Sequence, residues 1–572
     1  MRYRIVAGLL LLTASGLLLA QGLDRATLLK QPVDAWPTYN GDYSARRFSP
    51  LKQINSANVH TLSLLWSTRF IGTTAAAPAA GAAPAAGRGG RGGGAAGANL
   101  TPEGIGGPPG GGRGGGGPAA VSIKATPLMV NGILYFSAPN NAWAVDARTG
   151  RELWHYSYPP SSGSTIGNRG LGMYGNWLYM ETPDSHLVSL DAATGKERWK
   201  VQIADPKLDY TSTAAPIVVG NHILAGIGGD HLDNRGFIPS LDPETGAVQW
   251  KWYTTPNAGE PGIETWPDAY ASIHGNGQTW IPGSYDPVLN LYYFGTGNPN
   301  PVMAEQSRKG DNLYTCSIVA LNPDTGKMVW YYQPSPHDTH DWDATEAPVL
   351  IDGVIDGKPR KLLAQANRNG YFFLVDRTNG QHILTTPLID TINWTKGLNK
   401  NGQPIPDPAK YPKPDGALVS PASGGATNWP APSFDPETGL FYVGVNTTWS
   451  EFYQTDTDDH PEGYGGVDSA SGNEGGALLA IDYKTGKPVW RHNWPGGGGP
   501  SHILTTAGKL LFTGNGSNII AFDPANGKIL WHSSLFGNPT AGPITYMLDG
   551  QQHLLVVAGD SLYSFVVNQP AK

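Results

Sequence analysis

One stretch of the chain, Ser335-Pro-His-Asp-Thr-His-Asp-Trp-Asp343, concentrates side chains that can move protons or hold a metal. An ionised carboxylate, such as that of Asp341, can take the proton of a bound hydroxyl group. His337, His340 and Asp341 are also of the residue types that bind zinc. A purely structural acidic turn is a third interpretation. The residue types in this stretch leave all three open.

Two further residues offer binding chemistry. Asn298, within Gly295-Thr-Gly-Asn-Pro-Asn-Pro301, has an amide oxygen, which suits a hard cation such as calcium. Trp280 follows the Gly-rich stretch 275–277 and does not belong to a repeated turn. Its indole is the largest flat surface that a side chain can present to a planar ligand. From residue type alone, Asn298 can equally belong to a turn, and Trp280 can equally be a packing residue among the 18 Trp residues of the chain.

The composition indicates a large, turn-rich, β-rich protein. The chain has 572 residues, of which 76 are Gly, 48 are Pro and only 15% are charged. Coiled coils and helical bundles need charged faces and few turn residues, so both are excluded. The formal net charge of −7 speaks against a nucleic-acid or anionic-membrane partner. Cys316 is the only cysteine, which excludes an intramolecular disulfide and a Cys-x-x-Cys-His haem attachment.

Two segments are expected to lie outside the folded core. Residues 1–4 are basic and residues 5–20 are apolar, as in a signal peptide, and about sixteen apolar residues are few for a membrane span. We expect cleavage after residue 20 and a periplasmic or secreted protein without a membrane span, with a retained anchor as the alternative. Residues 73–120 consist mostly of Ala, Gly, Pro and Arg, which predicts a disordered insertion in a single domain over 21–572.

The elements that must position the candidate residues are strands of a repeat. Ala144-Val-Asp-Ala-Arg-Thr-Gly-Arg-Glu-Leu-Trp154 follows a short apolar strand, and similar stretches occupy 189–199, 240–250, 320–330, 480–490 and 521–531, with a degenerate copy at 374–384. In each, an Asp-x-x-Thr-Gly turn leads to a strand with a Trp. Such units predict an all-β fold, an eight-bladed β-propeller of four-stranded antiparallel blades with about 60 residues each. Seven blades are the alternative, and the repeated Trp residues are expected to pack between blades.

These motifs, in this order, resemble those of the PQQ-dependent methanol and ethanol dehydrogenases, which are eight-bladed quinoproteins. The resemblance runs from about residue 35 to residue 567 outside the insertion. It implies an oxidoreductase for an alcohol or aldehyde, with Asp341 as catalytic base and Arg368 at the reactive quinone carbonyls. It also implies PQQ with Ca²⁺ or a lanthanide as cofactors. Because haem attachment is excluded, the expected partner is a separate electron acceptor such as a cytochrome c.

The same resemblance assigns the remaining site residues. Arg169 matches an arginine that reaches a PQQ carboxylate, and a guanidinium fork suits that pairing. Asp343 matches an extra carboxylate of lanthanide-dependent relatives. The implied cofactor contacts are Lys124, Arg169, Thr213, Trp280 and Asn428. The implied metal ligands are Asn298, Asp341, Asp343 and Asp230.

The chain departs from the family pattern at four positions. Gly163 and Ser164 replace a vicinal cysteine pair, and Gly228 replaces a serine that binds the cofactor. A glutamate ligand of the metal is replaced within Gly228-Gly-Asp-His231, where Asp230 substitutes if the loop shifts by one residue. Lys124 stands in place of a glutamate and would attract a PQQ carboxylate. These departures keep a second function open, an empty quinoprotein-like propeller that acts as a binding or scaffold module.

Overall fold

The structure, a computed structural model, describes residues 22–72, 121–159, 167–229, 233–494, 499 and 501–567. The signal peptide predicted at 1–20 and the insertion predicted at 73–120 lie outside these residues. No helix in the described ranges has the length and apolar character needed to cross a membrane.

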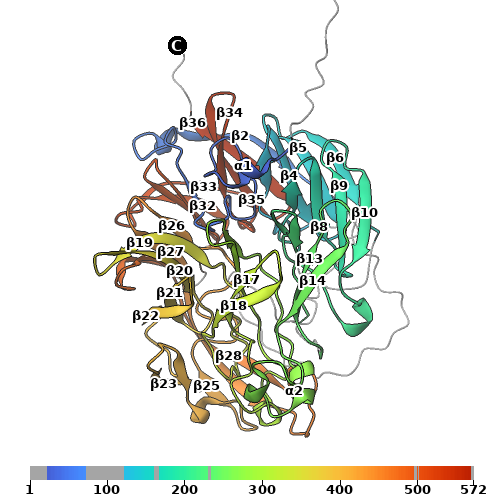
Figure 1. The fold of residues 1–572 in the computed structure, drawn as a ribbon. Helices are drawn as coiled ribbons and strands as arrows, with labels where there is room; N and C mark the ends of the chain where they lie inside the picture. The colour runs from blue at the N-terminus through green and yellow to red at the C-terminus, as the bar shows by residue number, and fades with distance from the viewer. Residues whose placement is uncertain are drawn as a thin grey trace, which may run out of the picture.

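Four-stranded antiparallel sheets are the building units, and Figure 1 shows them arranged around the centre of the molecule. The first blade consists of β3 (Leu128–Val130), β4 (Ile133–Ala138), β5 (Asn141–Asp146) and β6 (Glu152–Ser157), and the second of β7 (Gly172–Tyr174), β8 (Trp177–Glu181), β9 (His186–Asp191) and β10 (Glu197–Gln202). The third blade consists of β11 (Ile217–Val219), β12 (His222–Leu224), β13 (Phe237–Leu241) and β14 (Val248–Tyr253), and the fourth of β15 (Ser284–Asp286), β16 (Leu291–Gly295), β17 (Ile318–Asn322) and β18 (Lys327–Tyr332).

The next three blades consist of β19 (Val349–Ile355), β20 (Lys358–Ala366), β21 (Tyr371–Asp376) and β22 (Gln381–Pro387); β26 (Ser433–Asp435), β27 (Leu440–Gln454), β28 (Gly466–Asp482) and β29 (Pro488–Trp494); β30 (Leu504–Thr506), β31 (Leu510–Asn515), β32 (Asn518–Phe522) and β33 (Ile529–Ser534). Shorter elements outside the blades are α1 (Arg25–Leu28), β1 (Phe48–Ser49), α2 (Ala269–Ile273), β23 (Thr395–Leu398), β24 (Pro404–Pro406) and β25 (Ala417–Val419), with single 3₁₀ turns at Val59–Thr61, Pro206–Leu208, Ile263–Thr265, Glu305–Ser307 and Pro408–Lys410.

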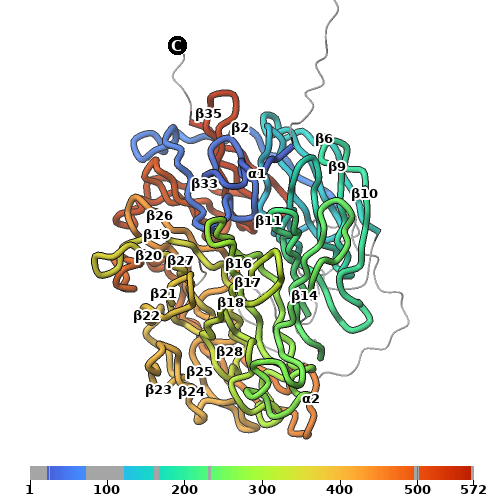
Figure 2. The backbone as a smooth tube through the Cα atoms, viewed as in Figure 1, coloured from blue at the N-terminus to red at the C-terminus, as the bar shows by residue number. Residues whose placement is uncertain are grey.

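The last blade joins the two ends of the chain. It contains β34 (Ile544–Leu548), β35 (Gln551–Ala558) and β36 (Ser561–Val567), and its outermost strand is β2 (Leu62–Arg69). The register pairs Leu62 with Val567 and Arg69 with Ser561, and Figure 2 shows blue β2 beside red β35. An N-terminal strand therefore closes the ring, and the predicted eight-bladed propeller is confirmed.

The repeated Trp residues pack between blades, as predicted. Trp154 donates its indole N–H to the Ala192 carbonyl at 3.0 Å. A Cβ atom on Gly195, whose φ is +70°, would lie 2.6 Å from the Trp154 ring, so only glycine fits this turn. The same contact joins Trp66 to Gly150, Trp199 to Gly246, Trp250 to Gly326, Trp330 to Gly380 and Trp490 to Gly527. In the degenerate copy Leu384 takes the place of Trp and faces Gly486.

The antiparallel order of the strands separates two faces of the propeller. The turns between first and second strands and between third and fourth strands lie on one face, which carries the repeated Asp-x-x-Thr-Gly turns. The turns between second and third strands, and the connections from one blade to the next, lie on the opposite face. The repeat residues are therefore spatially separate from the residues on that opposite face.

Candidate active site

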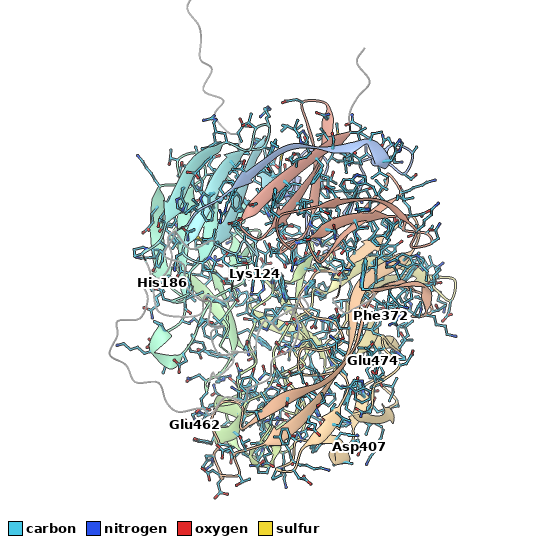
Figure 3. The ribbon with its side chains drawn as sticks, turned by 180° about the vertical axis from the view of Figure 1, so that it is seen from behind. Lys124, His186, Phe372, Asp407, Glu462 and Glu474 are labelled. Carbon is cyan, nitrogen blue, oxygen red and sulfur yellow. The ribbon has the colours of Figure 1, made fainter. Side chains whose placement is uncertain are left out.

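The predicted site residues that the structure describes all lie on the face opposite the repeated turns. Arg368 follows β20 and Asn298 follows β16, so both occupy turns between second and third strands. The other residues precede the innermost strand of a blade: Lys124 before β3, Arg169 before β7, Thr213 before β11, Trp280 before β15, Asp341 and Asp343 before β19, and Asn428 before β26. Figure 3 shows Lys124 near the centre of the molecule from behind. Asp230, Gly163 and Ser164 lie outside the described residues.

Arg368 joins Asp341, the predicted catalytic base, to Asp343, a predicted metal ligand. Its Nη2 lies 3.3 Å from Asp341 Oδ2, and its Nη1 lies 3.0 Å from Asp343 Oδ2. All three side chains are buried. Burial alone would lower the pKa of Arg368, but the charges of Asp341 and Asp343 outweigh it and raise the pKa above its ordinary value. The guanidinium is therefore a permanent cation at the centre of the site.

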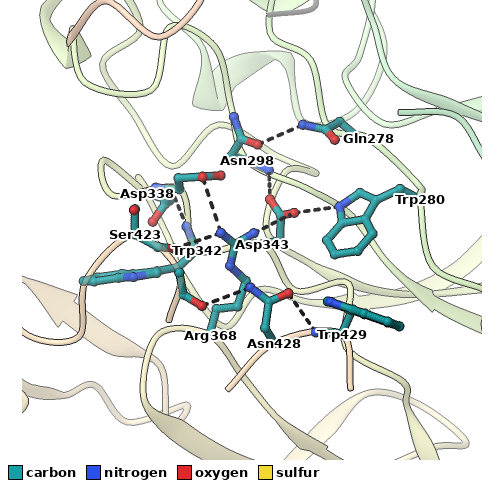
Figure 4. Close-up of polar contacts among 12 residues, drawn as sticks. Gln278, Trp280, Asn298, Asp338, Trp342, Asp343, Arg368, Ser423, Asn428 and Trp429 are labelled. Carbon is teal, nitrogen blue, oxygen red and sulfur yellow. Dashed lines mark hydrogen bonds and ion pairs between the residues drawn. The ribbon is translucent and has the colours of Figure 1, made fainter. Parts of the chain in front are cut away.

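Asp343 holds together three predicted site residues, as Figure 4 shows. Its Oδ2 accepts the indole N–H of Trp280 at 2.7 Å, and its Oδ1 accepts the backbone N–H of Asn298 at 2.6 Å. Burial raises the pKa of Asp343, and the charge of Arg368 opposes that rise. The Asn298 amide oxygen accepts from Gln278 at 3.1 Å, which fixes the orientation of the amide. An amide oxygen has two lone pairs, so this one can also bind a cation.

The backbone of Asp341 adopts a left-handed conformation, with φ at +66°, which is uncommon for a non-glycine residue. Oδ2 of Asp338 accepts the backbone N–H of Asp341 at 2.9 Å and that of Trp342 at 3.2 Å. Burial raises the pKa of Asp338 to about 6. The Tyr464 hydroxyl donates to Asp341 Oδ2 at 3.4 Å. The connection before β19 is thus folded around Asp338, which presents Asp341 to Arg368.

A guanidinium lies over the indole of Trp280. Cζ of Arg169 is 4.4 Å from the Trp280 ring centre and 5.4 Å from that of Trp429. Nη1 of Arg169 donates to the hydroxyl of Thr213 at 2.6 Å and to its carbonyl at 3.1 Å. Burial, with a smaller contribution from Arg169, lowers the pKa of Lys124 to about 8. Arg169 and Lys124 therefore lie close enough for their charges to affect one another.

Asn428 makes local hydrogen bonds only. Its amide nitrogen donates to the Gly424 carbonyl at 3.0 Å, and its amide oxygen accepts the backbone N–H of Trp429 at 2.7 Å. Figure 4 shows it beside Arg368 and Trp429. Its position, next to the described site but not bonded to the carboxylates, fits a residue at the edge of a bound ring.

Sequence reasoning missed two buried carboxyl groups at the site. Glu181 ends β8 and accepts the backbone N–H groups of Gly226 at 2.8 Å and Ala214 at 2.9 Å. Burial raises its pKa to about 7. Glu346 is also buried, and burial raises its pKa well above the ordinary range. Its place in the same connection as Asp341 is the only sequence signal for it.

The zinc interpretation of the His-rich stretch is not supported by the positions of its histidines. His340 stacks on Trp342 at 4.4 Å, and its ring nitrogens contact Thr339 Oγ1 and the Lys410 carbonyl. His337 contacts the Gly310 carbonyl at 2.6 Å and Glu305 at 3.3 Å. Within the described ranges, no three His, Cys, Asp or Glu residues gather in a metal-binding arrangement.

The donor set nevertheless fits a cation together with a planar, acidic quinone. Asp341, Asp343 and Asn298 supply the oxygen ligands that hard cations prefer. Trp280 supplies a flat aromatic surface, and the Arg169 guanidinium lies 4.4 Å from the centre of its ring. Arg169, Lys124 and Thr213 supply cations and a hydroxyl for carboxylates. These properties are those expected of a PQQ and metal site.

The chain is similar to known dehydrogenases over most of its length. A sequence model for the family described as "Glucose/ethanol/alcohol dehydrogenase, beta-propeller domain" matches residues 36–87 and 111–388. A second model, described as outer membrane protein assembly factor BamB, matches residues 473–568.

Individual relatives agree with the family match. The quinohemoprotein alcohol dehydrogenase ADH IIB of Pseudomonas putida is 33% identical, over 95% of this chain and 76% of that protein. The lanthanide-dependent methanol dehydrogenase of Methylacidiphilum fumariolicum is 32% identical, over 98% of this chain and 90% of that protein. The crystal structure of quinohemoprotein alcohol dehydrogenase from Comamonas testosteroni superposes with a TM-score of 0.81 at 31% identity, over 96% of this chain and 82% of that chain.

Proposed function

Because this chain belongs to the family of PQQ-dependent quinoprotein alcohol dehydrogenases, we propose that it oxidises a small alcohol or aldehyde with Asp341 as the base. The relatives cover most of the chain at 30–36% identity, and it is a PQQ alcohol dehydrogenase-like enzyme. Beyond membership of the family, we propose the catalytic base, the substrate, the identity of the metal and the electron acceptor.

One observation carries the proposal: Arg368 contacts both Asp341 and Asp343 in a fully buried site. Bound PQQ supplies a two-electron acceptor, and a bound Ca²⁺ or lanthanide ion supplies a Lewis acid. Asp341 takes the hydroxyl proton of the substrate on a carboxylate oxygen. Arg368 holds Asp341 in place and offers positive charge where negative charge develops.

Other residues of the site would bind and orient the cofactor and the metal. Trp280 would stack against the planar ring system, and its bond to Asp343 fixes the angle of the indole. Arg169, Lys124 and Thr213 would pair with carboxylates of the cofactor, and Asn428 would contact the ring. Asp343, Asn298 and Asp341 would bind the metal, and Asp230 is proposed as a further ligand.

The proposal extends to the acceptor, the compartment and the domain organisation. We propose that electrons pass to a separate acceptor such as a cytochrome c, in line with the relative named 1-butanol dehydrogenase (cytochrome c). A basic start followed by apolar residues 5–20 favours a cleaved signal peptide and a periplasmic or secreted protein. Residues 21–572 form one propeller domain, with 73–120 as an insertion.

The test is the substitution Asp341→Asn, which keeps the shape of the side chain and removes the base. With PQQ and either metal supplied, dye-linked oxidation of short alcohols and aldehydes should fall by roughly 10²–10⁴, the usual contribution of a positioned acid or base. PQQ binding should change little, because Trp280 and Arg169 are unaltered.

The matched control is Asp435→Asn. Asp435 is a buried aspartate at the end of β26, on the face of the propeller that carries the repeated turns. It should keep full turnover. Equal turnover in Asp341→Asn and wild type would refute the role of Asp341. Failure of the wild type to take up PQQ at any metal concentration would instead favour the non-catalytic binding module.

A further inference from the structure

Arg47 is a buried cation without a carboxylate partner. Its three guanidinium nitrogens donate to backbone carbonyls only: Nε to Ile503 at 2.9 Å, Nη1 to Tyr39 at 3.0 Å and Nη2 to Pro543 at 2.8 Å. In the part of the chain that the structure describes, no Asp or Glu lies within ion-pair distance of it. Burial lowers the pKa of Arg47 to about 10, so it remains charged at neutral pH. A buried charge of this kind is costly without a counter-charge.

Two hydrogen-bond donors without partners lie in the same cluster. His502 Nδ1 accepts the backbone N–H of Ala431 at 2.8 Å, and burial lowers the pKa of His502 well below its ordinary value. The ring is therefore neutral, and its hydrogen must reside on Nε2, which is buried without an acceptor. The Tyr39 hydroxyl is also buried without a partner, and burial raises its pKa, so it keeps its proton.

The cluster is compact and adjoins the proposed cofactor surface. The rings of Tyr39 and His502 meet edge to face, with centres 6.3 Å apart, and the positive charges of Arg169 and Arg47 act on both. His502 also meets Trp429 edge to face at 4.7 Å. Trp429 is the second ring, besides Trp280, over which Arg169 lies. The cluster therefore adjoins Arg169 both through Trp429 and through the direct effect of the Arg169 charge on Tyr39 and His502.

We propose that Arg47, Tyr39 and His502 form an anion site that binds a carboxylate group. One carboxylate can accept hydrogen bonds from both unpartnered donors and also balance the charge of Arg47. A water molecule could accept hydrogen bonds from the two donors but would not balance the charge of Arg47. A cation would be repelled by Arg47. The carboxylate belongs either to bound PQQ, which rests on the proposed function, or to a free small acid.

The variant Tyr39→Phe tests the site, because it removes the hydroxyl and keeps the ring. Its matched control is Tyr546→Phe, since the Tyr546 side chain is also buried but lies among the apolar side chains around β34 and β35. Two quantities are measured: the rise in melting temperature of cofactor-free protein with sodium formate, and the dissociation constant of PQQ in the presence of calcium.

We expect formate to raise the melting temperature of wild type and Tyr546→Phe, and to have a smaller effect on Tyr39→Phe. A hydrogen bond to a charged group is strong enough that PQQ should bind roughly 10-fold more weakly to Tyr39→Phe if its carboxylate fills the site. Loss of the formate effect with unchanged PQQ affinity would identify a free carboxylate as the occupant.

A second variant, His502→Phe, removes the other donor. It is expected to lower the melting temperature, because the Ala431 N–H loses its acceptor, so only the formate-induced shift is compared. The proposal is overturned if Tyr39→Phe and His502→Phe respond to formate and bind PQQ as Tyr546→Phe does. If wild type takes up no PQQ, the proposed function fails, while the formate measurement still decides whether the anion site exists.

Discussion

Trp280 and Asp343 form a single unit, since the indole N–H of Trp280 donates to Asp343 Oδ2 at 2.7 Å. The other oxygen of Asp343 accepts the backbone N–H of Asn298. A ring that stacks on Trp280 and a cation that binds Asp343 would therefore be positioned by the same carboxylate. Loss of the Asp343 carboxylate should therefore affect both the binding of a metal and the orientation of the Trp280 indole.

The first prediction concerns Asp343→Ala. Activity supported by a lanthanide should fall more than activity supported by calcium, because the higher charge of a lanthanide ion depends more on a second carboxylate. Trp280 should also lose its fixed orientation, which tryptophan fluorescence should detect. Titration of each metal against dye-linked turnover measures the difference. Identical metal dependence in wild type and Asp343→Ala would contradict the assignment of Asp343 as a metal ligand.

Local sequence patterns predicted the repeat and the residues that carry distinctive motifs. The motifs around Asp341 and Arg368 resemble those of the family in sequence alone, and the structure places the two side chains 3.3 Å apart. Trp154 was expected between blades because its turn is repeated, and it packs on Gly195.

Contacts between distant segments were not predictable in the same way. Glu181 ends an ordinary strand, and its role in bonding Ala214 and Gly226 depends on how two blades meet. Tyr464 lies more than 120 residues from Asp341 in the sequence, within the connection between β27 and β28. Arg47 and Ile503, the neighbour of His502, likewise meet only because β1 pairs with β30. No local sequence pattern predicts these contacts between distant residues, because they form only when separate blades pack together.

The second prediction is a pH dependence of cofactor binding that depends on Lys124. Burial lowers the pKa of Lys124 to about 8, so its charge is present below that pH and is lost as the pH rises through it. The affinity for an acidic cofactor should therefore fall above about pH 8. The unfolded chain keeps the lysine proton to about pH 10.4, so Lys124 makes stability rise with pH between these two values.

The variant Lys124→Gln provides the comparison, with PQQ affinity measured between pH 6.5 and about 9.5. It should bind PQQ more weakly at low pH and lack the decrease near pH 8. A decrease that persists unchanged in the variant would show that another group is responsible.

The third prediction concerns Tyr464→Phe. Its hydroxyl donates to Asp341 at 3.4 Å, and its carbonyl accepts the backbone N–H of Met303 at 2.8 Å, which holds the residue in place. Arg368 still contacts Asp341 in this variant, so turnover should fall only by about 2- to 10-fold, well short of the loss of a base. The acid limb of the pH–rate profile should move to higher pH, because Asp341 loses a hydrogen bond that favours its charged form.

Tyr453→Phe is the control for this effect, since Tyr453 belongs to β27 and its hydroxyl bonds to Glu451 instead. It should leave both the rate and the pH profile unchanged. A pH profile of Tyr464→Phe that coincides with that of Tyr453→Phe would mean that the Tyr464 hydroxyl does not position Asp341.

The last prediction is that residues 73–120 can be removed without loss of stability. The two described residues that flank this segment lie side by side, because a Cβ atom on Gly72 would be 2.5 Å from Cγ1 of Val121. A few Gly and Ser residues can therefore close the gap. Loop entropy changes by only about 0.6 kcal/mol for each doubling of length, so the melting temperature should remain nearly constant. A fall of more than about 10 °C, which for a protein of this size corresponds to roughly 3 kcal/mol or more, would show that the segment packs on the propeller. Dye-linked turnover of the shortened protein provides a separate readout, because Lys124 follows the deletion by only a few residues. Loss of turnover at an unchanged melting temperature would show that the segment affects the site without stabilising the fold.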